Sequence, residues 1–273
     1  MVEIYRVSDY IADFIAGIGV KNVFLLPGGG SMHLVDSVGK NSNLEVVACL
    51  HEQAAAISAE AYSRISENIG VAVVTTGPGA TNAITGVAGA WIESIPLMVI
   101  SGQCKRSDML HDSPLRQKGV QEVDIVKMVK SITKYAVIVE NPDDIRGIME
   151  KAFHSAKAGR AGPVWIDVPL DIQNQRINPE ELEQFVAGRD SKFEPLPEDI
   201  QYVIKALQNA ERPTILIGSG VRSADAVKDL ETFLEKYPVP LTYAGSAPDT
   251  YGADKSLSIG SMGTMGCSRA GNF

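Results

Sequence analysis

The sequence has little of what marks disulfide-rich, membrane or nucleic-acid-binding proteins. Its three cysteines, Cys49, Cys104 and Cys267, form none of the close pairs that zinc and redox sites use, so we expect them to be reduced and structural. No apolar run reaches the roughly 20 residues of a membrane span. The net charge of -8 argues against a nucleic-acid or anionic-membrane partner. The first residues do not resemble a secretory signal, which predicts a cytoplasmic protein.

Several catalytic motifs are also missing. His33, His111 and His154 lack the spacing and neighbours of a zinc site, so we predict no metal site in this chain. No serine lies in a Gly-x-Ser-x-Gly elbow, and no phosphate loop ends in Gly-Lys-Ser or Gly-Lys-Thr. Hydrolase and nucleotide-triphosphatase functions are therefore disfavoured.

What the sequence does contain is an alternation of short β-branched runs with longer helical patterns. This alternation predicts an α/β fold, a doubly wound parallel sheet with helices on both faces. The expected strands are 23–26, 45–50, 71–75, 97–101, 136–139 and 164–168, and the expected helices are 7–17, 52–65, 80–92 and 142–158.

The 273 residues are enough for two domains. We predict a first domain over 1–173, a charged, proline-containing linker over 174–196, and a second, incomplete α/β domain over 197–273. In the second domain we expect helices at 197–209 and 224–237, strands at 214–217 and 239–243, and a turn at Gly218-Ser219-Gly220.

Glu52 is the first residue to explain. It follows a run, 44–50, that has the pattern of a buried strand, and it opens an alanine-rich helix. This places an acid at the C-terminal rim of a sheet, where α/β folds bind ligands. An acid in the first turn of a helix can also serve the helix dipole alone. However, the alanine face lets another helix or subunit pack closely, which would remove water from Glu52 and suit it to proton exchange. His51 is more typical of a structural group.

Two glycine-rich turns follow strands at the same rim. The first contains Pro27, Gly28 and Gly29, and its backbone amides can approach a ligand closely. The second contains Thr76, Pro78, Gly79 and Asn82. Each turn could simply connect a strand to a helix, with a cap at the helix start. Their position beside Glu52 favours a ligand site.

Five blocks, in this order, resemble the N-terminal half of thiamine-diphosphate-dependent enzymes of the acetolactate synthase type. The blocks are Pro27-Gly28-Gly29, His51-Glu52-Gln53-Ala54-Ala55, residues 76–82, Ser101-Gly102-Gln103 and residues 163–173. The resemblance implies that Glu52 hydrogen-bonds the pyrimidine ring of thiamine diphosphate, so that the cofactor's own amine removes the thiazolium C2 proton. It also implies a 2-oxo acid substrate, with pyruvate the expected one.

The resemblance assigns further residues to the site. The two glycine-rich turns would line the pyrimidine ring and the substrate space. Gln103 and Gln121 match polar positions near the active centre. Val120 stands where many members have phenylalanine, and this difference reshapes the pocket for the acceptor.

The second domain and the partners follow from the same resemblance. Gly218, Ser219 and Gly220 match the turn that opens the middle domain, and residues 260–266 match a flavin-proximal segment, so FAD is a possible cofactor. The Gly-Asp-Gly motif that binds Mg²⁺ and diphosphate is missing. We therefore expect Mg²⁺ to be bound by a domain outside this chain, in the remainder of the enzyme or in a second polypeptide. A homodimer or larger assembly is expected, with the alanine-rich helix at the interface.

Three functions remain open from the sequence. The first is a decarboxylating carboligase that joins an acetaldehyde unit from pyruvate to a carbonyl acceptor. The second is a simple 2-oxo acid decarboxylase. The third is a non-catalytic subunit that dimerises or binds a nucleotide.

Overall fold

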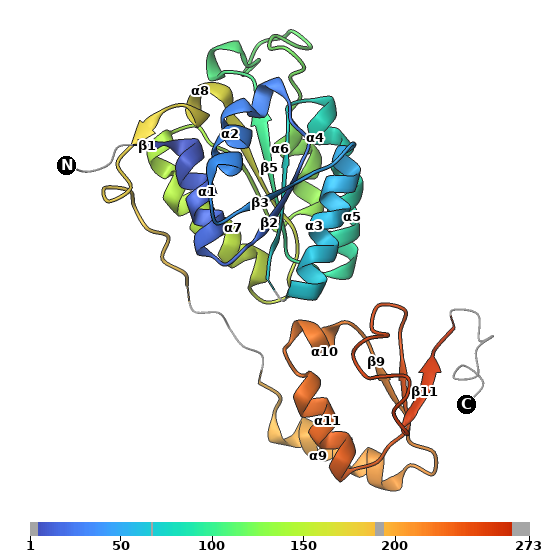
Figure 1. Cartoon of the computed structure of the whole chain (residues 1–273). Coiled ribbons are helices and arrows are strands. Elements are labelled where there is room, and N and C mark those ends of the chain that lie inside the picture. Colours follow the sequence, from blue (N-terminus) through green and yellow to red (C-terminus); the bar gives the residue numbers. More distant parts are fainter. Residues whose placement is uncertain (1–4, 67, 189–193, 264–273) are drawn as a thin grey trace. The chain divides into compact units, whose positions relative to one another are not determined.

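The computed structural model describes residues 5–66, 68–188 and 194–263. The chain divides into two compact units, Met1–Asp190 and Ser191–Phe273, and each is described by itself (Figure 1). No helix among the described residues is both long and apolar enough to cross a membrane.

The first unit is built on a six-stranded parallel sheet with the strand order β3-β2-β4-β5-β7-β6. This confirms the predicted doubly wound fold, because a parallel sheet needs a crossover after each strand and both of its faces are covered. The strands are β2 (Asn22–Leu25), β3 (Glu45–Ala48), β4 (Gly70–Val74), β5 (Leu97–Gln103), β6 (Tyr135–Ile138) and β7 (Val164–Pro169).

Helices cover both faces of this sheet (Figure 1). One face carries α1 (Val7–Gly17), α2 (Met32–Lys40) and α7 (Ile145–Lys157), and the other carries α3 (Glu52–Ser66), α4 (Pro78–Asn82), α5 (Ile84–Glu93) and α6 (Ile125–Val129). α2 lies where a helix of unstated length was expected after the first glycine-rich turn, and α6 was not predicted. The helix expected at 80–92 is divided into α4 and α5, and α4 already begins at Pro78, a residue suited to the first turn of a helix.

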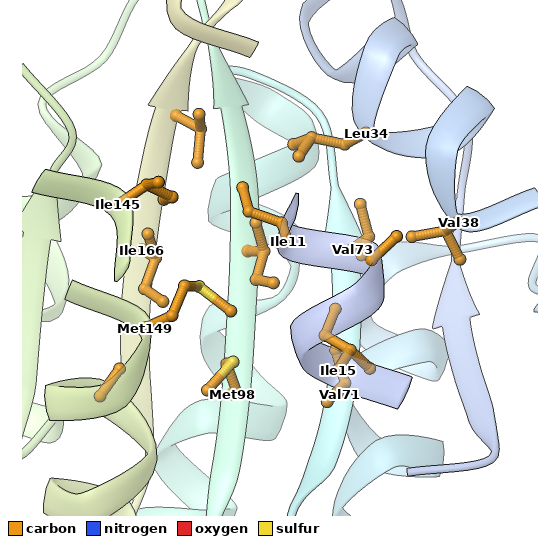
Figure 2. Packing of buried hydrophobic residues seen from close by; sticks show 14 of the residues in the cluster. Ile11, Ile15, Leu34, Val38, Val71, Val73, Met98, Ile145, Met149 and Ile166 are labelled. Atoms are coloured by element: carbon orange, nitrogen blue, oxygen red, sulfur yellow. The ribbon is translucent and has the colours of Figure 1, made fainter. Parts of the chain in front are cut away.

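Two separate cores result from the alternation of side chains along the strands. On one face, Ile11 and Ile15 of α1 pack over Val71 and Met98 of the sheet (Figure 2). On the other face, Ala72 and Val74 pack with Trp165 and with the small residues of α3 and α5. Gly86 of α5 allows this close packing, because a Cβ there would lie 2.6 Å from the Cβ of Ala56.

The strand before Glu52 is not buried in this chain, so the prediction of a buried run over 44–50 was wrong. β3 forms the edge of the sheet and pairs with β2 alone, and three of its four residues are exposed. Leu50, beyond the end of the strand, is 98% exposed. An apolar run therefore does not by itself identify a central strand, because β3 has such a run and lies at the edge of the sheet.

Part of the segment expected as a linker packs on the first unit. β8 (Arg176–Ile177) pairs antiparallel with β1 (Tyr5–Arg6), following the short helix α8 (Leu170–Gln173). Leu182 is buried in the first core, and the amide of Phe185 donates a hydrogen bond to Glu150.

The second unit has its own small parallel sheet, with the order β11-β10-β9. Its elements are α9 (Pro197–Asn209), β9 (Ile215–Ile217), α10 (Gly220–Ser223), α11 (Val227–Lys236), β10 (Leu241–Tyr243) and β11 (Ser258–Ser261). β11 adds a third strand to the two that the sequence predicted. Residues 264–266 of the expected flavin-proximal segment, together with Cys267, lie outside the described residues.

Candidate functional site

Glu52 is the first residue of α3, and its side chain is only 7% exposed. The Asn82 side-chain amide donates a hydrogen bond of 2.9 Å to its Oε2. Gly79 lies against the other oxygen, since a Cβ at Gly79 would be 3.0 Å from Glu52 Oε1 and 2.7 Å from the Thr75 methyl carbon. Asn82 is the one residue, in the part of the chain that the structure describes, whose side chain hydrogen-bonds this carboxylate. Oε1 therefore has no side-chain hydrogen-bond donor among the described residues.

The first glycine-rich turn packs directly on the second. A Cβ at Gly28 would lie 2.4 Å from the Cβ of Thr75, so no side chain fits there. The Gly30 amide donates a hydrogen bond of 3.1 Å to the Thr75 hydroxyl. Pro27 and Gly29 are exposed beside this contact, and Pro78 is exposed at the start of α4. The structure thus brings both predicted turns and Glu52 to one rim of the sheet.

The segment after β5 covers the second turn. Gly77 has a φ of 61°, and a Cβ there would lie 2.0 Å from the carbonyl oxygen of Gln121. Gln121 itself has a φ of 57°, an uncommon conformation for a residue with a side chain. Its neighbour Val120 is 82% exposed.

Glu122 holds this segment in shape. Its carboxylate accepts hydrogen bonds from the backbone amides of Leu110, Lys118 and Gly119. Burial of Glu122 opposes its charge, but these amides outweigh that effect and lower its pKa below the ordinary 4.5. The carboxylate is therefore ionised near neutral pH, and its hydrogen bonds stabilise the conformation of the segment that carries Val120 and Gln121.

Gln103 lies beneath the second turn and is 2% exposed. Its Nε2 donates hydrogen bonds to Asp167 and to the carbonyl of Val123, at 2.9 and 3.1 Å. Its Oε1 accepts from the Cys104 amide at 3.0 Å and, at 3.1 Å, from the Thr76 hydroxyl, whose single proton is shared with the Gly102 carbonyl at 2.8 Å. All four hydrogen-bonding positions of this amide are therefore in use.

Asp167 is the residue of this region to which sequence reasoning gave no role. It is 1% exposed and accepts hydrogen bonds from Ser101 Oγ at 2.5 Å and from Gln103 Nε2 at 2.9 Å. Trp165 Nε1 in turn donates to Ser101 Oγ at 2.8 Å. Burial raises the pKa of Asp167 to about 7, although both hydrogen bonds favour the charged form. The signal in the sequence was an acid inside the apolar run 164–168.

The raised pKa predicts how stability depends on pH. Between pH values of about 4 and 7 the folded protein keeps a proton on Asp167 that the unfolded chain has released, so its stability falls as the pH rises, by at most about 1.4 kcal/mol per pH unit. Asp167→Asn removes this dependence. Both tryptophans lie in the first unit, so urea unfolding followed by tryptophan fluorescence at pH 5 and 8 measures the effect. The wild-type protein should lose stability relative to the variant at pH 8, and equal changes in both would contradict the prediction.

Other candidate groups belong to the second unit or are unreactive. Gly218, Ser219 and Gly220 belong to the second unit, where Gly220 begins the four-residue helix α10. Burial, followed by the nearby acids, raises the pKa of the Cys104 thiol to about 11. Among the described residues, no group of three or more His, Cys, Asp or Glu side chains could hold a metal ion.

Comparison with known proteins agrees with the resemblance drawn from the motifs. Residues 5–128 match the family described as thiamine pyrophosphate enzyme, N-terminal TPP binding domain, and residues 200–273 match the central domain of the same enzymes. Chloroplastic acetolactate synthase of Arabidopsis thaliana is 34% identical over 95% of this chain and 38% of its own length. The acetolactate synthase large subunit of Buchnera aphidicola from Acyrthosiphon pisum is 33% identical over 96% of this chain and 46% of its own length.

The acetolactate synthase large subunit of Lactococcus lactis is 32% identical over 95% of this chain and 44% of its own length. The chain therefore spans less than half of the length of these relatives. Two matched domains in the order of the family, and relatives aligned along nearly the whole chain, point to one conclusion. This chain belongs to the thiamine pyrophosphate enzymes, of which it carries the N-terminal TPP binding domain and the central domain in a form similar to acetolactate synthase.

Proposed function

We propose that this chain supplies the pyrimidine-binding side of the active site in a thiamine-diphosphate-dependent carboligase. The reaction joins an acetaldehyde unit, formed by decarboxylation of pyruvate, to a carbonyl acceptor. The observation that carries the proposal is the Glu52 carboxylate, held by Asn82 through one oxygen at the rim where both glycine-rich turns meet.

The residues present fit an aminopyrimidine ring. Glu52 Oε1 is free to share a proton with a ring nitrogen, and Gly79 leaves room beside it. Asn82 fixes the rotamer of the carboxylate, so that the proton is exchanged at Oε1. When bound, thiamine diphosphate supplies the carbon nucleophile and the electron sink for decarboxylation. The proposed roles of this chain are to orient the ring, to exclude water around Glu52 and to hold that proton.

The other cofactors and the partners belong to the same proposal. We propose that Mg²⁺ and the diphosphate are bound by a further domain or a second polypeptide, and that FAD binding by the central domain involves Gly218, Ser219 and Gly220. The exposed edge strand β3 and the 98% exposed Leu50 support burial of this rim against another chain in a dimer or larger assembly. A cytoplasmic location belongs to the same proposal.

The acceptor side is assigned to Val120 and Gln121. The contact of Gly77 with the Gln121 carbonyl holds these residues over the second turn, and the exposure of Val120 leaves its side chain free to line a substrate space. A small aliphatic side chain at 120 leaves more room for the acceptor than a phenylalanine would.

A product assay tests the reaction. The complete enzyme, supplied with pyruvate, thiamine diphosphate and Mg²⁺, should form acetolactate or the adduct of an added aldehyde or ketone. Release of acetaldehyde alone, with no adduct for any carbonyl acceptor offered, would establish the simple decarboxylase instead. If the enzyme neither binds thiamine diphosphate nor consumes pyruvate, the proposed function is wrong.

A further inference from the structure

The buried side chains beneath the second glycine-rich turn form one connected chain of hydrogen bonds. It runs from Trp165 through Ser101 to Asp167, then through the Gln103 amide to the Thr76 hydroxyl. Every member contacts the next at 3.1 Å or less. Trp165 and Asp167 lie on the same face of β7, the face that α3 and α4 cover.

Gln103 is the point where three segments are joined. It contacts β7 through Asp167, the second turn through Thr76, and the end of the loop that carries Gln121 through the Val123 carbonyl. With every position of its amide occupied, Gln103 cannot bind a substrate without breaking one of these contacts. Its position beneath the site therefore fits a role in fixing geometry better than a role in direct contact.

Movement of Thr76 would change the surroundings of the Glu52 carboxylate. Thr76 precedes Gly77, which contacts the Gln121 carbonyl, and Gly79, which touches Glu52 Oε1. These contacts leave less space than a Cβ needs, so a small shift of the turn changes the wall around the carboxylate. Movement of Val123 would likewise shift Gln121, two residues away.

A buried carboxylate is a costly way to fill this space. Replacing buried ionisable groups by apolar residues of similar volume is often neutral or stabilising, because removing a charge from water is costly. The structure thus retains an acid in a place where packing alone does not need one. What the carboxylate adds is direction, since it accepts from Ser101 and Gln103 and so sets the orientation of the Gln103 amide.

We propose that Asp167 is a positioning residue of the cofactor site, which acts through Gln103 to fix both the turn at Thr76–Asn82 and the loop that carries Gln121. The inference rests on the proposed function for the identity of the ligand, thiamine diphosphate. The hydrogen-bonded geometry itself is independent of that identity. Asp167 does not touch the ligand.

Three variants test this role in the complete enzyme. Asp167→Leu removes both acceptors and should weaken thiamine diphosphate binding, measured by calorimetry, about tenfold or more. Asp167→Asn should stay within about threefold of wild type, because its oxygen accepts from Gln103 while its amide donates to Ser101, as a protonated carboxyl would. Gln103→Leu should reproduce the loss of affinity expected for Asp167→Leu. It allows the role to be tested if Asp167→Leu folds poorly.

Hydrogen exchange separates positioning from general destabilisation. In the 273-residue chain without cofactor, Asp167→Leu should speed amide exchange in residues 75–82 and 119–123 about tenfold relative to Ile166→Ala. Ile166 is the matched control, since it neighbours Asp167 on β7 but packs in the other core. Equal exchange in the two variants, together with unchanged cofactor affinity, would overturn the positioning role. Failure of the wild-type enzyme to bind thiamine diphosphate would overturn the proposed function while leaving the exchange result to decide on Asp167.

Discussion

Replacing Glu52 with glutamine in the complete enzyme is expected to lower turnover by about 100-fold or more. The amide keeps the shape of the carboxylate and can still accept the hydrogen bond from Asn82, so the fold and the turn at Gly79 should be unchanged. An amide cannot take up and return a proton, however, and proton transfer by a placed side chain typically contributes a factor of about 10² to 10⁴. The measurement is kcat on pyruvate at saturating thiamine diphosphate and Mg²⁺.

Glu60→Gln provides the matched control for this experiment. Glu60 lies on the same helix, is also largely buried, and is held by Arg64 rather than by a residue of the site. The control variant should keep its turnover within about threefold of wild type, because the loss of this partly exposed ion pair affects stability by about 1 kcal/mol or less. Turnover of Glu52→Gln within threefold of wild type would rule out the proton-sharing role.

The fold of the first unit was largely predictable because its strands carry a strong local signal. β4, β5 and β7 are largely apolar and are buried on both faces, as in a parallel sheet covered by helices, and the glycine-rich turns mark where strands end. α6, with 5 residues, escaped prediction, and α2, with 9 residues, was expected only as a helix of unstated length after the first glycine-rich turn. Both are short, and packing against other elements specifies them more than their own pattern does. The exposure of β3 could not be foreseen, because its apolar composition does not reveal that it lies at the edge of the sheet.

The site was predictable only in part, for a different reason. Glu52 and the two turns can be recognised in the sequence as an acid and glycines at strand ends, and the sheet topology brings such residues together. The buried residues beneath them cannot be recognised in this way, because a glutamine that faces a substrate and a glutamine that joins segments look alike in a sequence. Gln103 is distinguished by its hydrogen bonds to Thr76, Val123 and Asp167, which lie far apart in the chain. Only the folded geometry contains that information.

Gly102→Ala is expected to destabilise the first unit by about 3 kcal/mol. Gly102 is fully buried in β5, and a Cβ there would lie 2.0 Å from the carbonyl oxygen of Gly30 and 2.7 Å from the amide nitrogen of Ser31. Both obstacles are backbone atoms, so no side-chain rotation relieves the clash and the first turn must move. The measurement is the free energy of unfolding in urea, followed by tryptophan fluorescence.

Gly29→Ala is the control from the same turn. Gly29 has no atom within 4 Å of the added Cβ and has no positive φ, so its substitution should change the free energy of unfolding by less than about 0.5 kcal/mol. Equal stability of the two variants would mean that β5 and the first turn are not in close contact. Gly102→Ala should also affect cofactor binding, because Gly102 is followed directly by Gln103. β5 then contacts the first turn through the backbone of Gly102 and the second turn through the side-chain amide of Gln103. Displacing β5 should therefore weaken thiamine diphosphate binding in the complete enzyme, even where the chain still folds.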